Sequence, residues 1–281
     1  MKAVKLYEQL EKDFITPVLS DDWARHMSSV SEFLTENFKK RSMGLVCDNT
    51  NLITKVYTAV FPSIKIMQHI LNTDEENILL FIHHPQDWDI TKTEVFRQMD
   101  NSLLRQFKER KISIYNLHVP LDNFGEYSVS VSFAKALGVE IEKPFGPYHG
   151  GLGGVLGRTS FLTVADLSRH FTATLGHRTS LYQYGSDIIV DGRVALAPGG
   201  NMPSILSGVA IEGINTLLTG ISALNDHTRI AHEFAQEREI NILGGTHYSA
   251  EKFACMAMCK YFQKLGLSCT FIKGSPMFED L

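Results

Sequence analysis

Residues 77–85 have the sequence NILLFIHHP. The nearly continuous apolar run at 77–82 is typical of a β-strand that is buried on both faces of a sheet. Two histidines and a proline follow it directly, and Pro85 biases His84 toward an extended or turn conformation. Because α/β sheets place their ligand sites at such strand ends, the stretch predicts a buried strand that delivers two imidazoles to one edge of a sheet.

The segments on either side alternate between strand-like and helix-like patterns. Residues 1–40 have helical periodicity, and β-branched residues at 53–60 predict a strand that ends at Pro62. Further elements are expected as helices at 63–72, 92–110, 128–137, 161–174, 203–213, 226–239 and 250–265, and as strands at 112–117, 188–190, 193–196, 216–219, 240–243 and 269–273. This alternation favours an α/β protein with mixed sheets flanked by helices.

The segment 143–158 contains six glycines and two prolines and is predicted to be a loop. Its glycine-rich part, 150–158, resembles a phosphate-binding loop only in composition. It lacks the lysine and the glycine spacing of G-x-x-x-x-G-K-[ST], and Leu156 stands where G-x-G-x-x-G needs a glycine. A flexible loop that lines a pocket is the alternative.

Composition limits the classes of function. The chain has 281 residues, 44% of them hydrophobic, and a formal net charge of −4, which predicts about two globular domains and argues against binding nucleic acid through bulk charge. No apolar run is long enough to span a bilayer, and the first residues have the pattern of an amphipathic helix rather than a signal peptide. Four cysteines do not indicate a disulfide scaffold. We therefore expect a cytoplasmic protein without membrane contact.

Three segments carry the polar side chains that suggest chemistry: FIHHP at 81–85, NLHVPLD at 116–122 and GGTHYSAE at 244–251. In the last of them, His247 and Glu251 are four residues apart and share a face at a helix start. Each segment also has a plain structural interpretation, namely an incidental histidine pair, an aspartate that caps the next element, and an acidic residue favoured in a first helical turn.

Taken together, the three segments favour a metal site. They offer imidazole and carboxylate, the ligands of zinc, iron, manganese or nickel, and no thiolate. Five such ligands exceed a closed tetrahedral site and suit two ions that share a bridging carboxylate and a bridging water.

The three motifs, in this order and spacing, resemble the Nif-three-like family of dinuclear metal proteins, whose members are often labelled homologues of a type 2 GTP cyclohydrolase I. The segments at 43–49 and 214–220 are also similar to family motifs, and the resemblance covers about residues 40–275. It implies two divalent ions per chain, two α/β halves and a homohexamer. The metal ligands that it implies are His83, His84, Asp122, His247 and Glu251.

Because ligands come from both ends of the chain, we expect a discontinuous metal-binding domain, 1–122 plus 245–281, with a second α/β domain, 123–244, inserted into it. The expected function is hydrolysis of a small phosphorylated or nucleotide-like substrate by a metal-bridging hydroxide. His118 is the candidate for general acid–base catalysis or for support of a ligand.

Other readings of the function stay open. GTP cyclohydrolase activity is a more specific version that only the family label supports. A metal-stabilised oligomeric scaffold without catalysis is the alternative from another class. Departures from the family pattern at Phe61-Pro62, 151–157 and Ile221 leave the metal ligands intact but leave the substrate undetermined.

Overall fold

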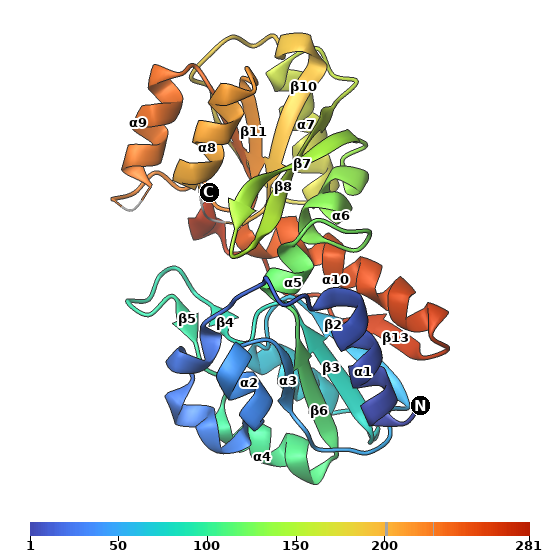
Figure 1. The fold of residues 1–281 in the computed structure, drawn as a ribbon. Helices are drawn as coiled ribbons and strands as arrows, with labels where there is room; N and C mark the ends of the chain where they lie inside the picture. Colours follow the sequence, from blue (N-terminus) through green and yellow to red (C-terminus); the bar gives the residue numbers. More distant parts are fainter. Residues whose placement is uncertain (200–201, 227) are drawn as a thin grey trace. The chain divides into compact units, whose positions relative to one another are not determined.

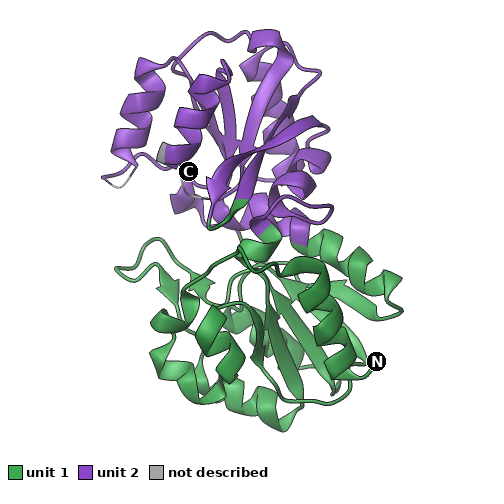
Figure 2. Cartoon of the chain, viewed as in Figure 1, with its two compact units in different colours: residues 1–121, 149–151, 255–275 green, residues 122–148, 152–254, 276–281 purple. Residues whose placement is uncertain are grey.

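The structure of the protein is a computed structural model that describes residues 1–199, 202–226 and 228–281. The chain forms two compact α/β units, each with its own mixed sheet and its own helices (Figure 1, Figure 2). Unit 1 comprises residues 1–121, 149–151 and 255–275, and unit 2 comprises 122–148, 152–254 and 276–281. The expected fold class is thus confirmed.

The sheet of unit 1 is built around the apolar run that the sequence analysis singled out. Its strand order is β1-β6-β3-β2-β13, with β3 parallel to β2 and β6, β13 parallel to β2, and β1 antiparallel to β6. All five residues of β3 are buried, as expected of a central strand. The strands are β1 (Gly44–Cys47), β2 (Lys55–Ala59), β3 (Ile78–Ile82), β6 (Ile112–Asn116) and β13 (Ser268–Phe271).

Several helices of unit 1 begin after a residue whose side chain satisfies the first backbone N–H groups. The hydroxyl of Ser63 accepts from the backbone of Ile66, and the carboxylate of Asp100 accepts from Ser102 and Leu103. The α-helices are α1 (Ala3–Phe14), α2 (Glu36–Arg41), α3 (Ile64–Leu71), α4 (Asn101–Glu109) and the start of α5 (Val119–Asp122), and short 3₁₀ helices cover Trp23–His26 and Ser28–Phe33. The helical periodicity predicted for 1–40 thus corresponds to two α-helices and two short 3₁₀ helices.

The predicted helix at 92–110 is wrong in its first half. Residues before Asp100 form the small antiparallel hairpin of β4 (Asp87–Trp88) and β5 (Phe96–Arg97). Arg97 donates to the carboxylate of Asp87 across this hairpin. The helix starts nine residues later than predicted because Asp100 is a strong N-cap, whose carboxylate accepts from the backbone of Ser102 and Leu103.

The sheet of unit 2 has the order β7-β8-β10-β11-β12-β9, in which β10, β11 and β12 are parallel to one another. Successive residues of β10 alternate between two hydrophobic clusters, so both faces of this sheet are covered. The strands are β7 (Glu140–Tyr148), β8 (Gly151–Arg158), β9 (Ser180–Tyr182), β10 (Arg193–Ala197), β11 (Thr216–Thr219) and β12 (Asn241–Gly244), and the helices are α6 (Val129–Ala136), α7 (Val164–Leu175), α8 (Met202–Ile211), α9 (Arg229–Glu237) and the first part of α10 (His247–Lys264).

The predicted loop at 143–158 is also wrong, because these residues form β7 and β8. Two glycines of β8 lie where a side chain would not fit. A Cβ on Gly154 would lie 2.5 Å from the ring of Phe145, and one on Gly157 would lie 2.4 Å from the carbonyl oxygen of Glu140. These glycines mark close approach of strands rather than flexibility.

Smaller differences concern element ends. The expected strand at 188–190 is replaced by a single bridge from Ile188 and a 3₁₀ turn, Val190–Gly192. Helix α9 begins three residues later than predicted, and His227 of the predicted helix lies outside the described residues. Helix α10 begins three residues earlier, so that His247 is its first residue.

The division into units differs from the predicted domain boundaries. Residues 245–254 and 276–281 group with unit 2 instead of unit 1, because Ala250 belongs to its hydrophobic core and the carbonyl of Asp280 accepts from the backbone of Ser222 and Ala223. Consequently His247 and Glu251 belong to unit 2, whereas His83 and His84 belong to unit 1.

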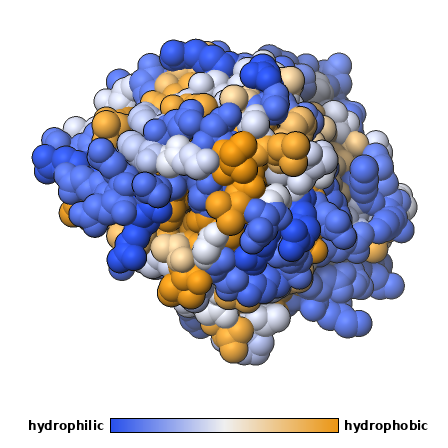
Figure 3. All heavy atoms as spheres, turned by 90° about the horizontal axis from the view of Figure 1, so that it is seen from above, coloured by the Kyte–Doolittle hydropathy of each residue, from blue (hydrophilic) through white to orange (hydrophobic). Residues whose placement is uncertain are grey.

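The surface seen in Figure 3 is mainly hydrophilic, with hydrophobic atoms reaching it in several places. Among exposed apolar side chains, Ile211 and Leu162 are the most accessible in the described part of the chain, at 84% and 77%. Within that part, no helix combines the length and the apolar character that crossing a membrane requires.

Candidate metal centre

Two histidines extend directly from the end of β3. The backbone N–H groups of His83 and His84 donate to the carbonyls of Ala59 and Val60, at 3.2 and 2.9 Å. Both histidines therefore continue the backbone pairing of β3 with the end of β2 and the residue that follows it. Their rings lie 4.5 Å apart between centroids and 70° apart in plane. The chain therefore turns enough at the strand end to bring both imidazoles to the same place.

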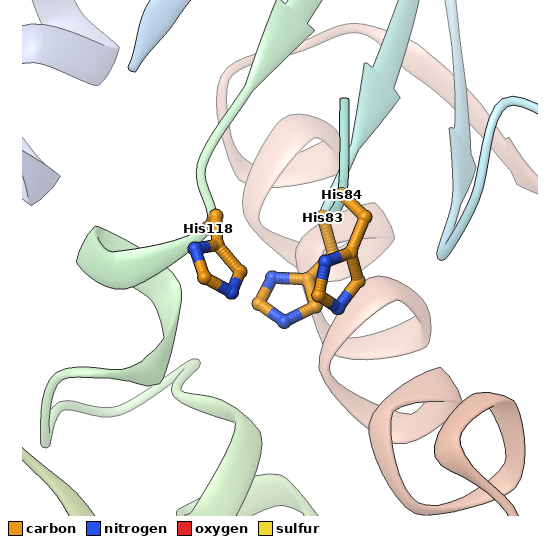
Figure 4. A group of neighbouring side chains, drawn as sticks. All are labelled: His83, His84 and His118. Carbon is orange, nitrogen blue, oxygen red and sulfur yellow. The ribbon is translucent and has the colours of Figure 1, made fainter. Parts of the chain in front are cut away.

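The third imidazole comes from the neighbouring strand. His118 follows β6, and its ring centroid lies 5.3 Å from that of His83 and 4.7 Å from that of His84. Figure 4 shows the three rings turned toward one another at the ends of the two strands. One ring nitrogen from each histidine lies within 4.8 Å of the others. This group of three buried imidazoles, which we call the histidine cluster, can hold a metal ion.

A hydrogen bond orients the ring of His83. Its Nδ1 lies 2.9 Å from the carbonyl oxygen of Leu117. A carbonyl only accepts, so Nδ1 carries the proton and Nε2 has the lone pair that a metal ion requires. The side-chain amide of Asn116 also donates to the carbonyl of His83. A ligating histidine normally has such a backbone acceptor on its second nitrogen.

His118 is held by a carboxylate from far away in the sequence. Its Nδ1 lies 2.8 Å from Oδ2 of Asp21 and 2.9 Å from Nε1 of Trp23. Because the indole only donates and an ionised carboxylate only accepts, Nδ1 serves one of them at a time. With Asp21 ionised, Nδ1–H donates to it and Nε2 becomes the nitrogen that can bind an ion or move a proton. This pairing supports the role expected of His118.

Aromatic side chains surround His84. The ring of Phe61 stacks on it at 4.9 Å, that of Phe96 stacks at 5.6 Å, and Trp23 contacts it edge-on at 5.7 Å. The histidine itself is 2% exposed. Apolar walls exclude water and strengthen the interaction of any ion with its ligands.

Unit 2 contains the remaining predicted ligands. His247 and Glu251 lie in the first turns of α10, with Nε2 and Oε1 3.1 Å apart, and both are buried. The backbone N–H of His247 donates to the carboxylate of Asp280 at 2.9 Å, which fixes the start of the helix. Asp122 is the last residue of α5 and is half-buried.

The donor set fits a divalent transition-metal ion. Imidazole and carboxylate are ligands that zinc, iron, manganese and nickel accept, and the buried histidine cluster provides three nitrogens in one place. The structure thus brings His83, His84 and His118 together in unit 1, and His247 and Glu251 together in unit 2.

Sequence reasoning missed Asp21 and Trp23. They contact His118 across 97 and 95 residues of sequence, and neither lies in a motif. An acidic residue near a tryptophan in an irregular segment has no local signal, so only the folded chain reveals this support.

Comparison with known proteins gives one family. The family model described as Duf34/NIF3 (NGG1p interacting factor 3) matches residues 24–276. A protein from Pseudomonas aeruginosa named GTP cyclohydrolase 1 type 2 homolog is 26% identical over 223 residues, covering 79% of this chain and 83% of that protein. A Pyrococcus horikoshii protein with the same name is 24% identical over 257 residues, covering 88% and 95%.

Solved structures share the fold. The protein ybgI, described as of unknown function, superimposes with a TM-score of 0.73 at 20% identity and covers 99% of this chain and 100% of its own. Reduced HcgD from Methanocaldococcus jannaschii gives a TM-score of 0.67 at 22% identity, with 98% of both chains covered. At these identities the likeness concerns the fold alone.

Proposed function

The chain belongs to the DUF34/NIF3 family, and on this premise we propose that it is a metal-dependent hydrolase that acts on a small phosphorylated or nucleotide-like substrate. The family resemblance drawn from the three sequence motifs is thereby confirmed. Family membership is shown by the match, whereas the metal ions, the reaction and the substrate are what we propose.

The histidine cluster is the observation that carries the proposal. Three imidazoles, each no more than 8% exposed, gather at the ends of two adjacent parallel strands. Buried polar groups are costly unless a partner satisfies them, and a group of imidazoles in one place is typical of metal binding. The carbonyl of Leu117 orients the ring of His83 as a supporting group of a metal site does, and the carboxylate of Asp21 orients the ring of His118 for proton transfer beside it.

We assign two divalent ions to the five ligands that the family resemblance implies. Of these ligands, His83, His84 and His247 would supply nitrogen, and Asp122 and Glu251 would supply oxygen. Two carboxylates and three imidazoles suit a pair of ions better than a single tetrahedral ion.

When bound, two divalent ions supply Lewis acidity and a nucleophilic water at neutral pH. The residues of the chain have separate tasks in that reaction. Asp21 holds the ring of His118 by Nδ1, so that Nε2 can take a proton from the attacking group or give one to the leaving group. Trp23, Phe61 and Phe96 keep bulk water away from His84.

The substrate class is supported by the names of the relatives. Several are called GTP cyclohydrolase 1 type 2 homolog, which makes GTP one substrate to test. The glycines at 151–157 form strand β8 rather than a phosphate-binding loop, so the chain has no triphosphate cradle in that segment. We therefore propose the broader class of phosphoesters and nucleotides.

The first experiment measures metal content and turnover on the same preparations. Wild-type protein, Glu251→Gln and the control Glu233→Gln, whose side chain is exposed on α9, are purified without chelator and reconstituted. Elemental analysis gives ions per chain, and a panel of p-nitrophenyl phosphate, nucleoside mono- and triphosphates and GTP gives turnover. We expect about two ions in wild type and in the control, and far fewer ions with no turnover in Glu251→Gln.

Two outcomes contradict the proposal in different ways. Wild-type protein that binds no metal after reconstitution removes the metal centre altogether. A protein that binds two ions but turns over no substrate class keeps the metal centre and contradicts the hydrolase. This outcome favours the metal-stabilised scaffold, in which bound ions raise the melting temperature and the protein binds a partner instead of a substrate. Light scattering on the same samples tests the homohexamer that the resemblance implies.

A further inference from the structure

Two cysteines of unit 1 face each other outside the histidine cluster. Cys259 lies on α10 and Cys269 lies on β13, and their sulfur atoms are 2.9 Å apart. Both side chains are half-buried, so neither is sealed in the core. In the sequence, Cys259 is four residues from Cys255 and ten from Cys269, and no local motif pairs it with either of them.

The remaining cysteines do not join this pair. The thiol of Cys255 donates to the carbonyl of Ala59 at 3.3 Å, and Cys47 is buried in the hydrophobic core. A structural zinc site needs four ligands, usually thiolates or imidazoles. Among the described residues, these two sulfurs belong to no group of three or more candidate metal ligands, and as a facing pair they match the reactants of a disulfide.

The hydrogen bonds around the pair make the two sulfurs unequal. The thiol of Cys269 donates to the sulfur of Cys259, and the hydroxyl of Thr58 lies 3.2 Å from the same sulfur. The donated hydrogen bond from Cys269 lowers the pKa of Cys259 to about 7, against the opposing effect of burial. Burial alone raises the pKa of Cys47 to about 12. Cys259 is therefore the sulfur that ionises first and attacks.

We propose that Cys259 and Cys269 form a reversible disulfide by exchange with a low-molecular-weight disulfide. The thiolate of Cys259 attacks one sulfur of that disulfide, forms a mixed disulfide and releases one thiolate. Cys269 then loses its proton and attacks the sulfur of Cys259, which forms the protein disulfide and releases the second thiolate. The two protein S–H bonds are lost, one S–S bond is formed, and the small disulfide is reduced to two thiols, which receive both protons.

The location of Cys269 permits the small movement that bonding requires. The sulfurs must approach from 2.9 Å to about 2.05 Å. Strand β13 pairs with β2 at the end of the five-stranded sheet, and the residues of β13 alternate between exposed and half-buried. An edge strand of this kind can shift without repacking a core.

The experiment equilibrates wild-type protein with mixtures of reduced and oxidised glutathione, blocks free thiols with N-ethylmaleimide and maps the peptides by mass spectrometry. Cleavage after lysine separates 253–260, which contains Cys255 and Cys259, from 265–273, which contains Cys269. We expect these two peptides joined, with the loss of two hydrogens, in the oxidising mixtures, and separate again after dithiothreitol. Cys47 should remain blocked as a free thiol throughout.

Variants identify the sulfurs. Cys259→Ala and Cys269→Ala should each abolish the joined peptides, while the matched control Cys255→Ala should retain them at wild-type yield. Should a variant fail to fold, fragmentation of the joined wild-type peptides locates the bond without it. The proposal is overturned if Cys269 stays a free thiol in the most oxidising mixture, if Cys269 carries only glutathione, or if the bond involves Cys255.

Discussion

Nδ1 of His83 lies 2.9 Å from the carbonyl oxygen of Leu117, the residue that immediately precedes His118. This hydrogen bond joins the ends of two adjacent parallel strands, β3 and β6, and at the same time fixes which nitrogen of His83 is the donor atom for a metal. The sheet register and the tautomer of a candidate ligand therefore depend on one another.

Substitution of His83 distinguishes the hydrolase hypothesis, which predicts a loss of turnover, from the scaffold hypothesis, which predicts a loss of melting temperature alone. His83→Gln removes a nitrogen ligand, so metal content should fall by about one ion per chain, and turnover should fall by more than the roughly 100-fold that loss of a supporting group costs. The variant is compared with His69→Gln, which removes an exposed imidazole of α3. Elemental analysis, turnover and melting temperature are measured together. A variant that keeps full turnover contradicts the assignment of His83.

The carboxylate behind His118 should matter although it touches no predicted metal ligand. Asp21→Asn keeps the shape but removes the charge that orients the ring, so we expect a loss of about 10–100-fold in turnover or metal affinity. The adjacent Asp22→Asn is the control, because Asp22 pairs with Arg25 on the surface. The pH profile of turnover should change in Asp21→Asn only. Equal effects of the two substitutions would remove Asp21 from the mechanism.

A buried histidine of unit 2 predicts acid sensitivity. Burial lowers the pKa of His232 below its ordinary 6.5, opposed by a hydrogen bond to the carbonyl of Ser222. The unfolded chain therefore takes up this proton at a higher pH than the folded chain does, and stability is complete above about pH 6.5 and is lost as the pH falls below it.

The measurement is urea unfolding between pH 5 and 7.5 on metal-free protein, with the wild type compared with His232→Gln. The wild type should lose more stability on acidification than the variant does. His232→Gln also changes the hydrogen bond between His232 and Tyr184. The comparison therefore uses the change in stability with pH and not the stability at pH 7.5. Parallel pH curves for the two proteins would show that His232 contributes nothing.

The close approach of strands at β8 predicts a strong effect of one methyl group. In Gly157→Ala the new Cβ would meet the backbone of Glu140 at 2.4 Å, and neither strand can yield easily, so unfolding should become easier by about 1–3 kcal/mol. The control is Gly125→Ala, whose Cβ would meet nothing closer than 3.8 Å. Urea denaturation measures both. A Gly157→Ala protein as stable as the control would mean that 151–158 is a loop after all.

The sequence predicted the elements whose apolar pattern matches their burial. The run at 77–82 became the central strand, and the two histidines after it reached the same place because the strand end turns. Prediction failed where the same residue type occurs in two structural contexts for different physical reasons. Glycines at 150–158 indicate a loop by composition, but Gly154 leaves room for the ring of Phe145 within a sheet.

Contacts between distant segments could not be predicted from local patterns. Asp21 reaches His118 from an irregular segment, and Cys269 meets Cys259 only because β13 is parallel to β2 beside α10. Residue types alone reveal candidates for chemistry, whereas the partners that orient them are set by the tertiary fold.

The position of β13 in the chain has a consequence for biosynthesis. Strand β2 is complete at Ala59, but the partner on its outer side is not made until Phe271. At about 5–20 residues per second, a ribosome takes on the order of ten to forty seconds to cover that interval. Throughout this time β2 is itself an open edge of the nascent sheet of unit 1, and β13 takes over that edge position only after more than two hundred further residues have been made.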